Sequence, residues 1–293
     1  MNSKQSNFEP RLVFWRVVRL IVNADDFGMT AGINRAVLEL HQVGALTSAT
    51  LMARAAATSS ATEMARANPR LGVGCHVVLV DGEPISAGRT SLAPGGHFYP
   101  TLGGFLRALF RGAIREADLY REAFAQIQSL QASGVTLTHI DTHKHTHMFP
   151  QVLRPVLRAA KECGIRAVRN PFEPQWSIAA TPGAPWVRRL EVRLLRRLEP
   201  RFRRIVAEEG FATTDGAIGV LATGTLDAAT IDSLLRAAPA SGTYELVTHP
   251  GYNDAELGGV RTRLRESRNT EREALLRLRA HPQVGLISFA ALA

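Results

Sequence analysis

Short apolar runs alternate with helical patterns along most of the chain. The runs are almost continuously apolar, which is typical of strands buried on both faces of a parallel sheet. Expected strands cover residues 17–22, 47–52, 71–80, 135–141, 165–169, 217–221, 244–247 and 285–289. One helix is expected to begin after Thr30, which would be its N-cap. Further helices are expected over 116–133, 151–163, 228–237 and 270–279. This order predicts an α/β fold, a TIM-like (β/α) barrel of about seven parallel strands rather than an open sheet.

The pattern indicates one domain with two exceptions to the regular alternation. Residues 1–16 have no clear periodicity, so we expect a flexible N-terminal tail. Residues 17–293 form the expected barrel domain, and the segment 171–215 interrupts the alternation as an insertion. No repeat or long Gly/Ser linker suggests a second domain.

Composition narrows the class of protein. The 293 residues are 45% hydrophobic, enough for a substantial core, and carry a net charge of +9. Arginine supplies nearly all the positive charge, aromatics are only 6%, and no nucleic-acid-binding motif stands out, so we expect no nucleic acid partner. Two cysteines exclude a disulfide framework and favour a reducing compartment. Without a transmembrane run or a signal peptide, the expected location is cytoplasmic.

Polar residues follow four of the expected strands. Asp25 and Asp26 end the first, His76 lies in the third, a cluster spans 139–147, and His249 follows a late strand. Side chains at the carboxyl ends of barrel strands meet at one end of the barrel. Taken singly, each feature has a structural explanation, such as a turn or a core histidine. Together they favour a catalytic site.

The cluster has a regular spacing that limits its role. His139, Asp141, His143, His145 and His147 are two residues apart and share one face while the chain stays extended. Same-face neighbours on a strand lie about 6.6 Å apart, so at most one or two can bind the same ion. Imidazoles and carboxylates from separate strand ends suit a catalytic divalent metal with an open position.

Four segments resemble the YdjC-like carbohydrate deacetylases, and within them the branch associated with hopanoid biosynthesis. The segments are 22–28, 74–79, 138–150 and 249–250, with the sequences VNADDFG, GCHVVL, THIDTHKHTHMFP and HP. The resemblance implies a distorted (β/α) barrel and metal-dependent removal of acetyl from an N-acetylated sugar. By motif, it assigns Asp26, His76 and His143 as metal ligands and Asp25 as general base. The chain departs from the family pattern at Val77, Thr142 and Lys144.

Further roles are less determined. We expect His249 to protonate the leaving amine, with His145 or His147 as alternatives, and Asp141 to orient a ligand histidine. Lys144 is expected to alter substrate contacts and places a cation near the metal. Two imidazoles and one carboxylate favour Zn²⁺, and the resemblance also allows Mg²⁺.

The segment 186–205 is a basic amphipathic pattern. Apolar residues recur every four positions and most others are arginine, and Pro200 is expected to end or kink the helix near Glu199. The apolar residues of this stripe are Trp186, Leu190, Leu194, Leu198 and Phe202, with Val187 and Leu195 beside them. Two interpretations stay open: the stripe packs on the barrel, or it lies peripherally on the inner membrane surface.

The favoured activity is deacetylation of an N-acetylglucosaminyl group, on a glycosylated hopanoid lipid. The alternatives are a deacetylase of soluble chitooligosaccharides such as diacetylchitobiose, a metal-dependent phosphoesterase on the same barrel, and a non-catalytic sugar- or membrane-binding protein. The paired base and metal ligands argue against the last, because binding alone requires neither. A homodimer is compatible with the sequence.

Overall fold

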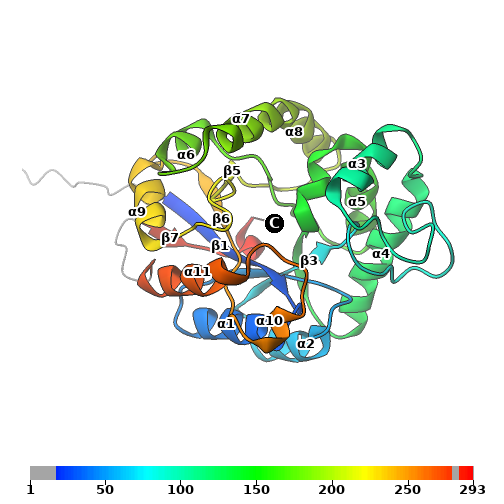
Figure 1. Cartoon of the computed structure of the whole chain (residues 1–293), viewed down its shortest axis with the longest axis horizontal. Coiled ribbons are helices and arrows are strands. Elements are labelled where there is room, and N and C mark those ends of the chain that lie inside the picture. Colours follow the sequence, from blue (N-terminus) through cyan, green and yellow to red (C-terminus); the bar gives the residue numbers. More distant parts are fainter. Residues whose placement is uncertain (1–17, 279–283, 293) are drawn as a thin grey trace, which may run out of the picture.

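The structure is a computed structural model that describes residues 18–278 and 284–292; the expected tail at 1–16 lies outside these residues. Its strands form one parallel sheet in the order β4-β3-β2-β1-β6-β5, and β7 pairs with the start of β1. The strands are β1 (Val18–Phe27), β2 (Ser48–Leu51), β3 (Gly72–Val77), β4 (Leu137–Thr142), β5 (Gly216–Ile218), β6 (Thr243–Thr248) and β7 (Val284–Leu286). The sheet curls into a ring with the helices outside it (Figure 1).

Two isolated bridges continue the sheet between its outer strands. Ile140 of β4 pairs with Val168, and Ala167 pairs with Ala212, a few residues before β5. The seven-stranded parallel sheet with its covering helices confirms the prediction of a distorted TIM-like barrel.

Several expected strand boundaries are wrong, for local reasons. Residues 165–169 make single bridges rather than a strand, and Pro171, which has no N–H for a ladder, follows them closely. β3 stops at Val77 because the Val78 N–H donates to Gln126. β5 stops at Ile218 because Gly219 has φ 84° and its N–H donates to Glu173. β7 ends at Leu286, and β1 continues through Phe27.

The helices flank the strands as the alternating pattern predicts. Thr30 caps α1, its hydroxyl accepting from Ile33 N at 3.2 Å, and α4, α5 and α9 agree with the predicted helices within about one residue at each end. The predicted helix at 270–279 begins earlier, at Arg265, and residue 279 lies outside the described part. The α-helices are α1 (Ala31–Gln42), α2 (Thr58–Ala67), α3 (Leu102–Phe110), α4 (Glu116–Ala132), α5 (Pro150–Glu162), α6 (Gln175–Ala180), α7 (Trp186–Leu195), α8 (Glu199–Glu208), α9 (Ala228–Ala237), α10 (Ala255–Gly258) and α11 (Arg265–Leu278). Three 3₁₀ turns are η1 (His143–Met148), η2 (Arg196–Leu198) and η3 (Phe289–Ala291).

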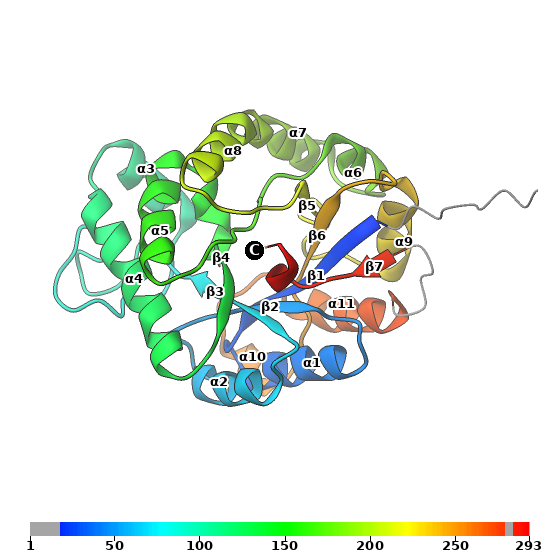
Figure 2. The same ribbon diagram turned by 180° about the vertical axis from the view of Figure 1, so that it is seen from behind.

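The C-terminal turn η3 fills the middle of the ring of strands (Figure 2). Phe289 is fully buried against Ile21 and Ala167, and its ring stacks on His139 with centroids 3.8 Å apart. His139, the first histidine of the cluster, therefore belongs to the packed interior.

The segment 171–215 carries α6, α7 and α8, which follow one another along one side of the barrel (Figure 1). Pro200 stands in the first turn of α8, so the α7 helix ends before it as predicted. The apolar stripe divides at this point: Phe202 is fully buried, whereas Trp186 and Leu190 are exposed. The described residues contain no helix that is both long and apolar enough to span a bilayer.

Candidate metal and catalytic site

The end of β1 presents two adjacent carboxylates at the mouth of the barrel. In a regular strand, Asp25 and Asp26 would point to opposite faces. Here the register with β2 shifts between Ala24 and Phe27, and Asp26 adopts φ 64°, so both side chains reach the same site. The Asp25 Oδ1 atom accepts hydrogen bonds from Asn23 Nδ2 at 2.9 Å and Thr50 Oγ1 at 3.1 Å.

Three side chains from three strand ends bring potential metal-ligand atoms together. His76 Nε2 lies 3.6 Å from Asp26 Oδ1 and 3.2 Å from His143 Nδ1. His143 Nδ1 lies 3.4 Å from the same Asp26 oxygen. Two ligands bonded at 2.0–2.1 Å in tetrahedral geometry are separated by about 3.3 Å, close to these values. Buried Asp26 Oδ1 has no hydrogen-bond partner among the described residues. The donor set therefore fits a divalent metal.

A second group of potential ligand atoms comes from Asp25, His76 and Asp141. The fully buried Arg169 already occupies this side. Its guanidinium binds both oxygens of Asp25, at 2.6 and 2.8 Å, and also pairs with Asp141. An arginine in direct contact disfavours a second cation, so the Asp26–His76–His143 group is the better metal site.

Asp141 and Arg268 fix the orientation of this candidate metal site. His76 Nδ1 lies 2.8 Å from Asp141 Oδ1, which directs Nε2 toward Asp26. Arg268 Nη2 of α11 donates to Asp26 Oδ2 at 2.5 Å and leaves Oδ1 free to face the histidines. Asp141 thus lies where the sequence predicts an orienting residue.

The charged neighbours of Asp25, Asp26 and His76 shift the pKa values of these three side chains away from their ordinary values. Burial alone would raise the pKa of Asp25, but Arg169, with a smaller contribution from His76, holds it well below the ordinary value. Arg268 and His143 likewise outweigh burial and keep the pKa of Asp26 well below 3.8. Burial would lower the pKa of His76, yet Asp141, Asp25 and Asp26 raise it to about 9. Both aspartates therefore stay ionised, and with Asp141 they hold a proton on His76, at the position that a metal ion would take.

His249 follows β6 and faces Asp25 Oδ2, whereas Asn23 binds Oδ1. Its Nε2 lies 3.8 Å from Asp25 Oδ2, and its backbone N–H donates to Glu271 at 2.6 Å. Burial lowers the pKa of His249 to about 4, against the opposing effect of Asp25 and Asp26, so the ring is neutral near pH 7. Nδ1 is buried and has no hydrogen-bond partner among the described residues.

The rest of the histidine cluster has other environments. The extended chain ends at Thr142, and Lys144 and His145 adopt positive φ values of 59° and 53°, so the two-residue alternation stops. His147 turns inward and its ring contacts Thr142 Oγ1 at 2.8 Å and the Arg169 carbonyl at 3.2 Å. His147 therefore supports the arginine.

Lys144 and His145 lie nearer the rim of the site. Lys144 Nζ pairs with Asp81 at 3.6 Å, on the loop after β3. His145 is partly exposed, and its Nδ1 atom is buried without a hydrogen-bond partner in the described structure. Burial, reinforced by Arg169, lowers the pKa of His145 to about 3.

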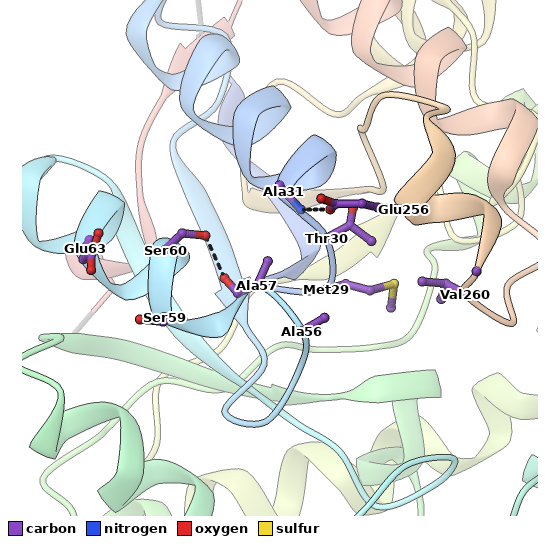
Figure 3. Close-up of a pocket in the computed structure, with 11 residues that line it drawn as sticks. Met29, Thr30, Ala31, Ala56, Ala57, Ser59, Ser60, Glu63, Glu256 and Val260 are labelled. Carbon is purple, nitrogen blue, oxygen red and sulfur yellow. Dashed lines mark hydrogen bonds between the residues drawn. The ribbon is translucent and has the colours of Figure 1, made fainter.

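A pocket of about 690 Å³ lies between the starts of α1 and α2 and the α10 segment (Figure 3). Small residues line much of it, and Glu63 and Glu256 contribute carboxylates. The Ala31 N–H donates to Glu256 at 2.8 Å. Met29 also lines the pocket, and its sulfur lies 3.9 Å from Arg268 Nη2. Arg268 is the ion-pair partner of Asp26. This contact links the pocket to the metal site, although Asp25, Asp26, His76 and His143 are not among the lining residues.

Sequence reasoning missed the two buried arginines, Arg169 and Arg268, and the buried acid Glu245. Arg169 ends an expected strand, and Glu245 interrupts an apolar one. A charged residue within a buried strand is unusual, so the positions of these two residues weakly indicate a buried ion pair. Arg268 lies in a largely polar helix, and nothing in its surroundings distinguishes it from surface arginines.

The profile of the family described as YdjC-like protein matches residues 19–284. A carbohydrate deacetylase of Geobacillus stearothermophilus is 42% identical over 152 residues, 51% of this chain and 60% of that relative. Another, of Brevibacillus brevis, is 40% identical over 156 residues, 53% of this chain and 60% of that relative. These matches thus span about three fifths of the length of each relative. The structure of a candidate cellobiose-phosphate cleavage protein of Enterococcus faecalis aligns with a TM-score of 0.72 and 24% identity, covering 94% of this chain and 99% of that one, and supports the fold.

Proposed function

Because this chain belongs to the YdjC-like protein family, we propose that it is a metal-dependent carbohydrate N-deacetylase. The observation that carries the proposal is the meeting of Asp26, His76 and His143 beside a separate carboxylate, Asp25. Hydrolysis of an amide needs an activated water, a polarised carbonyl and a proton for the leaving amine. Each requirement has a residue in suitable reach.

Asp26, His76 and His143 would hold the ion, and Zn²⁺ suits two imidazoles and one carboxylate, with Mg²⁺ as the alternative. When bound, such an ion lowers the pKa of water and polarises a carbonyl oxygen. Asp141 keeps the His76 ring in the binding orientation, and Arg268 keeps Asp26 turned toward the histidines.

Asp25 accepts the proton of the attacking water. Arg169 and Asn23 fix its orientation, but the low pKa of the carboxyl means that it retains a proton poorly. Neutral His249, 3.8 Å away, receives that proton and donates it to the nitrogen as the carbon–nitrogen bond breaks. Water oxygen thereby joins the acetyl carbon, and the products are acetate and the free amine.

The substrate is an N-acetylglucosaminyl group, and its sugar occupies the 690 Å³ pocket between α1, α2 and α10. We place this sugar on a hopanoid lipid, because the four motif segments resemble that branch most. We expect Lys144, whose Nζ pairs with Asp81, and the partly exposed His145 to contact the part of the substrate outside this pocket. Soluble chitooligosaccharides are the alternative substrate class.

The test measures acetate release from an N-acetylglucosaminyl hopanoid and from diacetylchitobiose in parallel. The protein is stripped with chelator and then assayed with and without Zn²⁺ or Mg²⁺. We expect release that requires the ion, with the hopanoid as the better substrate. Asp25→Asn should lower kcat about 10²- to 10⁴-fold, the usual contribution of a general base.

A matched control keeps this result interpretable. Asp232→Asn changes an exposed carboxylate on α9, outside both the pocket and the metal site, and should retain kcat. Metal binding without acetate release from either substrate would refute the deacetylase assignment, and the same stripped and reloaded protein would then be tested for phosphoesterase turnover. Preference for diacetylchitobiose would refute the hopanoid substrate and leave the deacetylase assignment intact.

A further inference from the structure

Helix α7 exposes an apolar face instead of packing it on the barrel. Trp186 is 74% exposed, Val187 55%, Leu190 48% and Leu194 47%. These residues are three or four positions apart and share one face of the helix. Val192, on the opposite face, is buried against Ile178 and Leu221. The helix is therefore anchored through one side and presents the other to its surroundings.

The charge next to this face is strongly positive. Residues 186–205 contain eight arginines and two glutamates. Arg193, Arg197 and Arg201 are exposed, and none of the described residues pairs with them by an ion pair or a hydrogen bond. Unpaired guanidinium groups beside exposed tryptophan and leucine match the anionic headgroups and acyl-chain boundary of a charged bilayer.

We propose that α7 docks the protein on an anionic phospholipid surface, with Trp186, Leu190 and Leu194 at the acyl-chain boundary and the three arginines among the headgroups. A second copy of this chain is a poorer occupant, because it would bring two arginine-rich segments together. The inference rests on the geometry of α7 and not on the deacetylase activity.

The docking helix lies at the catalytic end of the barrel. Arg188, near the start of α7, donates to the carbonyl of Val220 at 3.5 Å, on the loop that follows β5. Asp25, His76 and His249 lie at the carboxyl ends of neighbouring strands. A bilayer under α7 would therefore lie near the opening of the site, where a lipid carries its headgroup.

The experiment is flotation of the full chain with vesicles. One set is phosphatidylcholine with about 30% phosphatidylglycerol, and the other is phosphatidylcholine alone. We expect binding to the anionic vesicles that weakens with salt, and little to the neutral ones. The apolar variant Trp186→Ser/Leu190→Ser and the charge variant Arg193→Gln/Arg197→Gln/Arg201→Gln should each bind at least tenfold more weakly. All five positions are exposed, so the fold should be retained, which circular dichroism checks.

Matched controls separate this face from the general positive charge of +9. Arg70→Gln/Arg89→Gln/Arg111→Gln removes the same charge from exposed positions elsewhere, and Phe110→Ser removes an aromatic side chain that is 60% exposed on α3. Both controls should bind like wild type. Equal losses in control and α7 variants, or no binding of wild type to anionic vesicles, would overturn the proposal. So would a dimer in solution that dissociates when Trp186 and Leu190 are replaced, which would assign the face to a second copy.

Discussion

Glu245 places an acid in the interior of the barrel at an energetic cost that depends on pH. It is fully buried on β6, where Oε1 accepts from Arg169 Nε at 2.8 Å and Oε2 has no hydrogen-bond partner in the described part of the chain. Burial raises its pKa from 4.5 to about 7, although Arg169 opposes the change. A pKa raised by folding means that stability is fully present below about pH 4.5 and is lost as the pH rises toward 7. The difference corresponds to about 3 kcal/mol.

Glu245→Gln should remove this dependence. The glutamine oxygen can still accept from Arg169, and its amide replaces the unpartnered Oε2. We therefore expect the variant to match wild type near pH 4.5 and to exceed it by about 3 kcal/mol above pH 7.5, or about 6 °C in Tm. The assay is urea unfolding of both proteins from pH 4.5 to 8.5, with Glu63→Gln as an exposed control. A difference between variant and wild type that stays constant with pH would refute the reasoning.

Three further changes test the site and the packing around it. Asp141→Asn should weaken metal binding about 10- to 100-fold, because His76 loses the carboxylate that orients it, and equilibrium dialysis should detect this in folded protein. Gly74→Ala should lower the free energy of unfolding in urea by about 1–3 kcal/mol, because the new Cβ would lie 2.6 Å from the ring of His139, which stacks on Phe289. An unchanged urea midpoint would contradict this packing. Phe202→Ala should cost about 3–5 kcal/mol, since the ring is fully buried on α8, whereas Trp186→Ala should change stability by less than about 0.5 kcal/mol.

The sequence predicted which strand ends meet, because chain order and the barrel rule are sufficient for that. Asp25, His76 and His249 follow β1, β3 and β6, and the order β3-β2-β1-β6 brings these ends side by side. What spacing could not predict is which cluster histidine enters the site. That depends on the turn at His143–Met148, where positive φ values break the alternation.

The amphipathic segment shows a second limit of pattern reasoning. Periodicity of four predicts a stripe on 186–202 but not which part finds a partner. Pro200 starts a new helix, and the three-residue turn η2 separates it from α7. As a result, Phe202 reaches Phe172, with centroids 5.5 Å apart, while Trp186 stays exposed. The interpretation that the stripe packs on the barrel therefore applies to Phe202, whereas the membrane interpretation of the exposed half stays a prediction.

The buried arginines make the acidic site compatible with folding. Asp25, Asp26 and Asp141 are all buried, and isolated charges there would be strongly unfavourable. Arg169 pairs with two of them and with Glu245, while Arg268 pairs with the third. Removing either arginine would leave its aspartates buried without a counter-charge, which typically costs about 3–5 kcal/mol. Asp26 Oδ1 still faces His76 and His143 without a hydrogen-bond partner among the described residues, so these ligand atoms stay available to a divalent cation. The arginines thus stabilise the barrel interior and leave one cluster of ligand atoms free to bind an ion.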